Sequence, residues 1–192
     1  MRVVGGVLSG RRLQAPRGLR TRPTSDRVRE SVFMALEPFT GMCVVDLFAG
    51  TGALGIEALS RGAATVDFAE HDRSALAALK SNLATLGIED RATIWTVDLE
   101  RDLKRLKLPL AAADLVLLDP PYGSDAGARV LEGVAEPGIL APGTRVVVEH
   151  HLKDEPPEAL GVLSLERRRR YGETVVSFYR AAEAGPGTEE IS

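Results

Sequence analysis

The sequence predicts an α/β fold in which helices cover both faces of a mostly parallel sheet of seven strands. From residue 42 onward, apolar runs of strand length alternate with stretches of helical periodicity, the pattern of βαβ units around a buried parallel sheet. After Pro156 and Pro157, two more runs of strand length are separated only by a short turn. Because so short a connection joins antiparallel strands, the sheet is expected to end in an antiparallel hairpin.

Each expected element rests on its own local pattern. The parallel strands are expected at residues 43–48, 65–69, 92–97, 114–118 and 145–149. The connecting helices are expected at residues 53–60, 73–86, 99–106 and 127–135. The antiparallel strands are expected at residues 162–169 and 174–180, which brings the total to seven.

The segment before the sheet combines a hairpin with a helix. Residues 2–13 alternate weakly around two glycine-containing turns, which predicts a small β-hairpin. The residues around Asp26 can cap a helix whose apolar face includes Val32 and Phe33 and which ends at Pro38. We therefore expect a basic hairpin extension at residues 1–22, a main domain at 23–180 and a disordered tail at 181–192.

Length and composition limit the class of protein. A chain of 192 residues with 44% hydrophobic residues fits one globular domain with a small appendage. The single cysteine, Cys43, excludes a disulfide framework and favours a reducing compartment. Because the sequence contains no apolar run of signal-peptide or membrane-spanning length, we expect a cytoplasmic protein.

Basic charge is concentrated at the start of the chain. Residues 1–30 carry a net charge of +6, although the whole chain carries −3. Such concentration is typical of phosphate binding, and it recurs in the run of arginines at 167–170. The alternative is a solvated surface. The candidate RNA-binding residues are Arg2, Arg11, Arg12, Arg20, Arg22 and Arg29.

A glycine-rich turn follows the first expected strand. Gly50, Gly52 and Gly55 form a GxGxxG pattern between a strand and a helix, where glycines permit a tight turn and close approach of a ligand. Glu70 lies 20 residues after Gly50, at a strand end where a carboxylate can accept hydrogen bonds from ribose hydroxyls. A nucleoside cofactor is therefore expected. The alternative is a tight turn without a ligand.

Two aspartates bear on which cofactor binds, because NAD and S-adenosylmethionine (AdoMet) both contain adenosine. Asp46, just before the turn, favours AdoMet, which has no pyrophosphate but has an α-ammonium group. Asp98, at the end of the third expected strand, can accept a hydrogen bond from the adenine amino group. The alternative for either aspartate is a helix cap.

The most specific motif is Asp119, Pro120, Pro121 and Tyr122 after a buried strand. Two prolines lack N–H donors, so the turn presents carbonyl oxygens without competing donors. Asp119 and the Pro120 carbonyl can accept both hydrogens of a base amine, and Tyr122 can stack on a base that has left its helix. The alternative is a turn leaving the strand, with Tyr122 in the core.

These motifs resemble those of the class I AdoMet-dependent methyltransferases, which have a Rossmann-like fold. The hairpin RVVGGVLSGRRL, the run RPTSDRVRESVF and the late RRRRYGETVVSFYR closely resemble the RsmD family of 16S rRNA guanine-N2 methyltransferases. The resemblance spans residues 1–180. It implies AdoMet as methyl donor, guanine N2 in small-subunit rRNA as acceptor, and a ribosomal subunit or its assembly intermediate as substrate.

The resemblance also implies roles for particular residues. The cofactor site comprises Asp46, Phe48, Gly50, Gly52, Gly55, Glu70 and Asp98, and the amine-binding motif comprises Asp119, Pro120, Pro121 and Tyr122. Thr24 and Arg27 reach the cofactor carboxylate or the RNA, or else their segment docks the helix. No metal is expected, because the three histidines have neither cysteine partners nor metal-site spacing. The protein is expected to be a monomer.

Three other classes remain open. A DNA or RNA adenine-N6 methyltransferase shares the amine-binding motif, but the chain has no room for a large target-recognition domain. An NAD-dependent oxidoreductase shares the glycine-rich turn and Glu70, but leaves the proline motif unexplained. A non-catalytic RNA-binding module uses the arginines alone and needs no cofactor.

Overall fold

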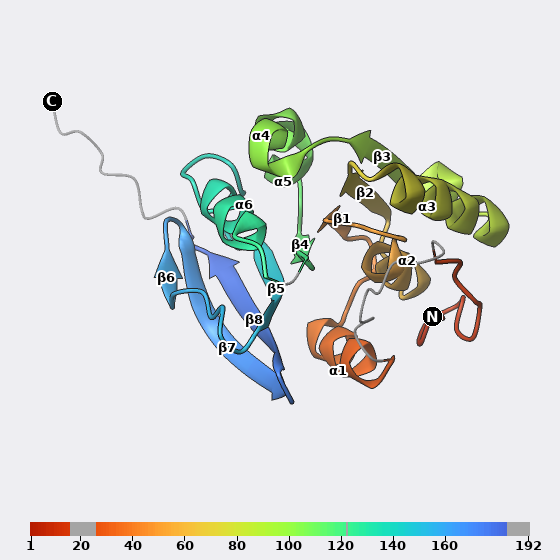
Figure 1. Ribbon diagram of the computed structural model, residues 1–192, viewed down its shortest axis with the longest axis horizontal. Coiled ribbons are helices and arrows are strands. Elements are labelled where there is room, and N and C mark those ends of the chain that lie inside the picture. Colours follow the sequence, from red (N-terminus) through yellow and green to blue (C-terminus); the bar gives the residue numbers. More distant parts are fainter. Residues whose placement is uncertain (16–25, 122, 184–192) are drawn as a thin grey trace, which may run out of the picture.

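The computed structural model describes residues 1–15, 26–121 and 123–183. Its eight strands form one sheet in the order β3-β2-β1-β4-β5-β8-β7-β6 (Figure 1). The first five strands in this order are parallel, and β8, β7 and β6 each run antiparallel to the preceding strand. The bounds are Cys43–Leu47 (β1), Thr65–Glu70 (β2), Ala92–Thr96 (β3), Leu115–Leu118 (β4), Arg145–His151 (β5), Ala159–Leu160 (β6), Leu163–Tyr171 (β7) and Thr174–Ala181 (β8).

Helices cover both faces because alternate residues of a strand point to opposite sides of the sheet. Val44 and Leu117 join the core beneath α1, α2 and α3, whereas Val45 and Val116 join the core beneath α4, α5 and α6. The helix bounds are Asp26–Leu36 (α1), Ala53–Ser60 (α2), Arg73–Leu86 (α3), Leu99–Asp102 (α4), Lys107–Ala111 (α5) and Ala126–Val134 (α6), with 3-10 turns at Glu89–Arg91 (η1) and Leu103–Leu106 (η2). In the described parts of the chain, no helix has the length and apolar character needed to cross a membrane.

The expected α/β class and the antiparallel end of the sheet are confirmed, but the sheet has eight strands rather than seven. The additional strand, β6, has two residues and pairs with the start of β7, so it is too short to produce a periodic pattern. The helix expected at 99–106 is divided into α4 and η2, and α5 follows directly. The expected tail falls mostly on residues 184–192, which lie outside the described residues.

Residues 1–15, called the N-terminal strap, fold back on themselves as a short antiparallel hairpin, as expected. Its arms meet at a bridge between Arg2 and Arg12, and the Val3 N–H donates to the Arg11 oxygen at 3.0 Å, but the pairing is too short to form two regular strands. The strap is also held by α2 (Figure 1), because Glu57 accepts a hydrogen bond from the Val4 N–H at 2.8 Å. The hydroxyl of Ser60 also accepts one from the Leu8 N–H at 2.9 Å. The helix that follows the glycine-rich turn is therefore also the dock for the strap.

A buried carboxylate is the centre of this docking. Glu57 is fully buried and pairs with Arg61 at 2.8 Å and with the Nε of Arg29 at 3.8 Å. Arg29 also donates to the backbone oxygen of Arg2 in the strap and to Asp26. One carboxylate thus joins α1, α2 and the strap. A buried charge of this kind is tolerated only when oppositely charged groups and hydrogen bonds surround it.

Two arginines of the sheet bind the C-terminal end of α1. Arg145 of β5 donates to the backbone oxygen of Leu36 at 2.8 Å, and Arg167 of β7 donates to that of Ala35 at 2.9 Å. The guanidinium of Arg167 also lies 4.5 Å from the ring centre of Phe178. The last carbonyl groups of a helix receive no hydrogen bond from within the helix. By donating to one of them, Arg167 gives the arginine run at 167–170 a structural role in addition to any role in binding.

We predict that Glu57→Gln lowers the free energy of unfolding by about 3–5 kcal/mol, the usual cost of leaving a buried charge without its partner. The amide keeps the shape of the side chain but removes the charge that faces Arg29 and Arg61. Denaturant unfolding measures the loss. The matched control is Glu37→Gln, because Glu37 also pairs with Arg61 but is 54% exposed. Its removal should cost about 1 kcal/mol or less, and equal losses for both variants would contradict the assignment.

Candidate active site

The turn after β1 has the backbone that its glycines predict. Gly50 has φ 56° and Gly52 has φ 83°, in the left-handed region that glycine adopts without strain. Phe48, which is not a glycine, has φ 60°. A Cβ on Gly52 would lie 2.4 Å from Leu79 of α3, so only a glycine fits there. The turn is therefore fixed both by conformation and by packing.

Gly55 serves the packing of α2 on the sheet. A Cβ at this position would lie 2.3 Å from the ring of Phe68 in β2. Its N–H donates to the carboxylate of Asp46 at 2.9 Å. The third glycine of the motif thus allows the helix to approach the sheet and places Asp46 directly beneath the turn.

Glu70 ends β2 and reaches across to the same turn. One carboxylate oxygen accepts from the Gly50 N–H at 2.8 Å, and the other accepts from the N–H groups of His71 and Asp72 at 2.7 and 2.8 Å. These three bonds hold the side chain in place but do not use its full acceptor capacity, because a carboxylate can accept about four hydrogen bonds. The arrangement leaves acceptor capacity for about one further hydrogen bond, such as one from a hydroxyl group of a ligand.

Asp98 follows β3 and caps α4, as the helix-cap alternative expected. Its side chain accepts from the Glu100 N–H at 3.1 Å and pairs with Arg101 at 3.5 Å. The side chain is 39% exposed, so its cap role leaves it accessible at the carboxyl edge of the sheet. A contact with adenine therefore stays a prediction.

Three carboxyl groups lie close together near the carboxyl ends of neighbouring parallel strands. Asp46 pairs in register with Leu117, two residues before Asp119. Leu118 pairs with Val148, so Asp119 and Glu149 follow a pair of adjacent residues. Burial raises the pKa of Asp46 to about 7; the hydrogen bond from Gly55 opposes this rise and the charge of Glu70 adds to it. Asp46 is therefore partly protonated near neutral pH.

Asp119 is affected by the same crowding. Burial, then the charge of Glu149 and then that of Asp46, raises the pKa of Asp119 well above its ordinary value. A raised pKa makes the carboxylate a stronger proton acceptor, and it also makes the group sensitive to any cation placed nearby. The edge therefore combines a potential base with an environment that favours a positively charged ligand.

The proline turn borders a cleft of about 440 Å³, which we call the proline cleft. Its walls include Pro120, Pro121, the start of α6 and the segment 154–157. Gly127 of α6 packs so closely on Pro120 that a Cβ would lie 2.6 Å from the proline ring. A cleft of this volume lies within the range of about 300–1,000 Å³ found for small-molecule sites. Tyr122 lies outside the described residues.

The expected RNA-binding arginines separate into different environments. Arg2 and Arg12 line one shallow hollow at the strap, and Arg11 is exposed and donates to the Thr85 oxygen at 3.2 Å. The placement of Arg29 on an RNA-binding surface is wrong, because Arg29 is 1% exposed and belongs to the Glu57 network. Charge counts along a sequence do not distinguish a buried guanidinium from a surface one.

The remaining expectations concern α1 and the segment before it. Arg27 is exposed in the first turn of α1. Arg20, Arg22 and Thr24 lie outside the described residues. Within the described ranges, no group of three or more His, Cys, Asp or Glu side chains is arranged to hold a metal ion.

Two residues of the site were missed by the sequence analysis. Glu149 is 7% exposed and borders the proline cleft; its place one strand away from Asp119 could have been found by counting along the next expected strand. Asn82 of α3 is 2% exposed and donates to the Thr51 oxygen in the glycine-rich turn at 3.0 Å. It also accepts from the Gln14 N–H of the strap at 2.7 Å, a pairing that no local pattern indicates.

The strand order, the antiparallel strands after β5 and the glycine-rich turn after β1 together define a class I methyltransferase. The family described as Conserved hypothetical protein 95 matches residues 1–180. The chain belongs to this family, the RsmD family.

Individual relatives agree with this membership. YlbH of Bacillus subtilis, which is named as an rRNA methyltransferase, is 40% identical over 181 residues, covering 94% of this chain and 98% of that protein. Ribosomal RNA small subunit methyltransferase D of Escherichia coli is 33% identical over 187 residues, covering 96% of this chain and 92% of its own. The solved structure of Escherichia coli YhhF, described as a methyltransferase, has a TM-score of 0.82 and 33% identity, covering 96% of this chain and 99% of its own.

We predict that Asp46→Asn removes a pH-dependent penalty from folding. The raised pKa, about 7 against an ordinary 3.8, means that the folded state retains a proton that the unfolded state releases. The contribution of this proton to stability is complete below pH 4 and is lost as pH rises to about 7. Each pKa unit corresponds to about 1.4 kcal/mol. As pH rises from 4 to 8, the free energy of unfolding of the variant should therefore increase by a few kcal/mol relative to that of the native protein.

Denaturant unfolding of both proteins across this pH range measures the difference. Asparagine can still accept the hydrogen bond from Gly55, and the comparison at pH 4, where Asp46 is protonated, provides the internal control. A difference in unfolding free energy that stays constant from pH 4 to 8 would contradict the assignment.

Proposed function

We propose that this protein transfers a methyl group from AdoMet to the exocyclic N2 amine of one guanine in 16S ribosomal RNA. The observation that carries the proposal is the meeting of a glycine-rich turn, a proline turn and three carboxyl groups at one sheet edge, in a chain of this family. The relatives named as ribosomal RNA small subunit methyltransferase D support rRNA as the substrate. The guanine N2 acceptor follows from the family resemblance.

The residues at the glycine-rich turn suit AdoMet. Gly50, Gly52 and Gly55, with Phe48, would bring backbone close to the cofactor, and Glu70 would accept a hydrogen bond from a ribose hydroxyl. Asp46 would face the α-ammonium group, whose charge offsets the raised pKa of this buried carboxyl. Asp98 would accept from the adenine amine, and Thr24 and Arg27 would reach the cofactor carboxylate or the RNA. AdoMet supplies a methyl carbon bonded to a positively charged sulfur.

The proline turn would hold the base. Asp119 and the carbonyl of Pro120 accept the two hydrogens of the amine, Pro121 keeps the turn free of a competing N–H donor, and Tyr122 stacks on the ring. The bound amine then directs its lone pair away from the ring. Guanine N2 is barely basic before attack, so alignment contributes most and the proton leaves late. The raised pKa of Asp119 suits it to receive that proton.

The strap and the segment after it would bind the RNA backbone. Arg2, Arg11 and Arg12 at the strap, with Arg20 and Arg22 beyond it, supply the positive charge. The substrate is an assembled or assembling small subunit, bound by a monomer in the cytoplasm. Because the amine lies inside a paired helix in duplex RNA, the target guanine must be unpaired or flipped out.

The function is tested by incubating the protein with labelled AdoMet and unmodified small subunits and mapping the methylated nucleotide by mass. A methyl group on a guanine base at N2 supports the proposal. Transfer to adenine N6 instead would favour the adenine-methyltransferase alternative, and the absence of any transfer to unmodified subunits or naked 16S rRNA would refute both.

We predict that Asp119→Ala lowers the turnover number at least about 100-fold, because it removes an amine acceptor and a proton acceptor together. Calorimetry should find AdoMet affinity unchanged within about twofold, since Asp119 serves the base rather than the cofactor. Asp125→Ala is the control, because Asp125 follows the same proline turn and borders the proline cleft, but its side chain is 88% exposed. Full activity of Asp119→Ala would refute its assignment.

We predict that replacing Arg11 and Arg12 together with alanine weakens RNA binding and makes it less dependent on salt. Each lost phosphate contact should lower the slope of log affinity against log salt by about 0.7–0.9. Binding to small-subunit RNA at several salt concentrations measures this slope. Arg105→Ala is the control, since Arg105 is an exposed arginine in η2 beneath the opposite face of the sheet. If the double variant kept the native affinity and the native slope, the assignment of the strap to RNA binding would be wrong.

A further inference from the structure

Glu149 lies at the sheet edge beside the proline turn, and the reaction proposed above gives it no role. It follows Val148, the register partner of Leu118, and Asp119 follows Leu118. Neighbouring parallel strands carry paired side chains on the same face. Glu149 and Asp119 therefore project from adjacent strands toward the same side, and the charge of Glu149 contributes to the raised pKa of Asp119.

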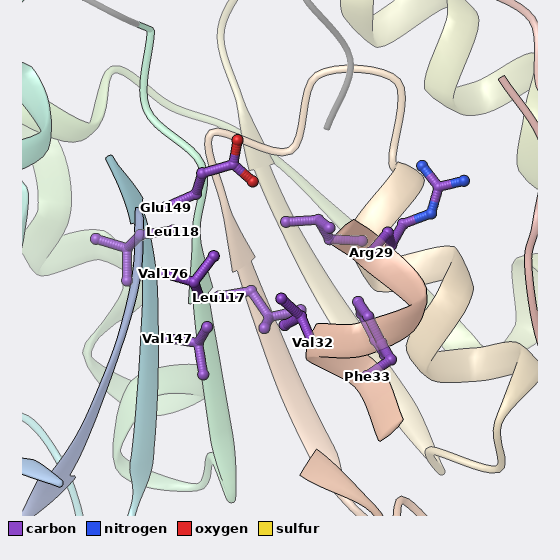
Figure 2. Close-up of a pocket in the computed structure, with 9 residues that line it drawn as sticks. Arg29, Val32, Phe33, Leu117, Leu118, Val147, Glu149 and Val176 are labelled. Atoms are coloured by element: carbon purple, nitrogen blue, oxygen red, sulfur yellow. The ribbon is translucent and has the colours of Figure 1, made fainter. Parts of the chain in front are cut away.

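Glu149 also borders two hollows. One is the proline cleft, whose lining residues include Glu149, Pro120 and Pro121. The other is a small apolar cavity of about 20 Å³ beneath α1, where Figure 2 shows the carboxylate at the end of a row of apolar side chains that includes Val147 and Val176. A cavity of that size holds about one water molecule, so a base would meet Glu149 outside it, at the carboxyl ends of the strands beside Asp119.

Arg29 lines the small cavity as well, but its guanidinium is turned away from Glu149 (Figure 2). Its ion pairs are with Asp26 and Glu57. Glu149 is 7% exposed, whereas Glu132, another acid of the cleft, is exposed to solvent. A hydrogen bond to a charged group gains strength where water is excluded, so Glu149 is better placed than Glu132 to discriminate between ligands.

The chemistry of guanine calls for an acceptor at this place. Guanine carries an N–H at N1 immediately beside the N2 amine, whereas adenine carries a lone pair at N1 beside its N6 amine. When Asp119 and the Pro120 carbonyl accept the two amine hydrogens, the N1–H needs a third acceptor beside them. An unpaired N–H buried in the site would cost a large part of the binding energy.

We propose that Glu149 accepts the N1–H of the target guanine and thereby makes the site specific for guanine. This inference rests on the proposed function, since it assigns the base-reading residue of the same site. Glu149 acts on recognition rather than on the transfer itself, and no proton needs to move to it. A carboxylate opposing the N1 lone pair of adenine would repel it.

The test uses 2-aminopurine, which keeps the amine at C2 but has a lone pair in place of the N1–H. After the methylated guanine has been mapped, small subunits are reassembled with either guanine or 2-aminopurine at that position. The measured quantity is the ratio of kcat/KM for the two substrates. The native enzyme should favour guanine by about 10-fold to 100-fold, as expected for a hydrogen bond to a charged group.

Glu149→Gln should reduce that ratio at least about tenfold, because the amide can turn its NH₂ toward the N1 lone pair of 2-aminopurine. Glu132→Gln makes the same change in charge in the same cleft and should leave the ratio unchanged. The missing oxygen at C6 of 2-aminopurine affects all three enzymes alike, so it cancels in the comparison. A thermal midpoint and an AdoMet titration check that each variant is folded.

The outcomes separate the inference from the function on which it rests. If the native enzyme methylates guanine but shows no preference over 2-aminopurine, the role of Glu149 is refuted even if Glu149→Gln does not fold. If both variants keep the native ratio, the role is likewise refuted while the methyltransferase stands. If the native enzyme methylates no guanine in the subunit, the proposed function itself fails.

Discussion

The structure depends on a conflict at one edge of its sheet: three carboxyl groups lie close together near the carboxyl ends of neighbouring parallel strands, where burial and like charge oppose the ionisation of Asp46 and Asp119. Register brings Asp46, Asp119 and Glu149 together, because Asp46 is level with Leu117 of β4, and Asp119 and Glu149 follow the paired residues Leu118 and Val148. The raised pKa values of Asp46 and Asp119 are the measure of that conflict. A fold does not retain such an edge for stability, since the ionised groups weaken it. In the proposed function this conflict would be relieved by the positive charge of AdoMet on one side and by the N–H donors of guanine on the other.

A second buried charge links this edge to the basic end of the chain. Glu57 lies in α2, the helix that begins at the glycine-rich turn, and it holds both the strap and Arg29. Asn82 makes a similar link from α3, since it contacts Gln14 in the strap and Thr51 in the turn. The basic strap is therefore attached to the elements that shape the cofactor turn rather than to a remote surface. In the proposed function, an RNA backbone bound at the strap would be held at a fixed position relative to the proline turn.

The sequence could predict those features that depend on local spacing. The pattern from Gly50 to Gly55 requires a left-handed turn and a close helix, and the structure has both. Local spacing carries no information about which distant side chains meet, so the pairing of Glu57 with Arg29 was missed and Arg29 was wrongly placed on the surface. The two-residue strand β6 was missed because periodicity needs length. Glu149 falls between these cases, since its neighbourhood follows from the order of strands β4 and β5 once that order is assumed.

Some arginines of this chain stabilise the fold, and others are left free of that task. Net charge does not separate the two groups, so it is a poor guide to where RNA would bind. Arg145 and Arg167 donate to last-turn carbonyls of α1, and Arg29 and Arg61 surround a buried carboxylate. The planar guanidinium offers five donors in a fixed arrangement and keeps its charge when buried, so it suits both tasks better than lysine does. The arginines left for the proposed RNA contacts are the smaller set at the strap and beyond it. The strap is bound to α1 and α2 through Arg29 and Glu57, so in the proposed function recognition of the RNA would depend on the same contacts that hold the domain together.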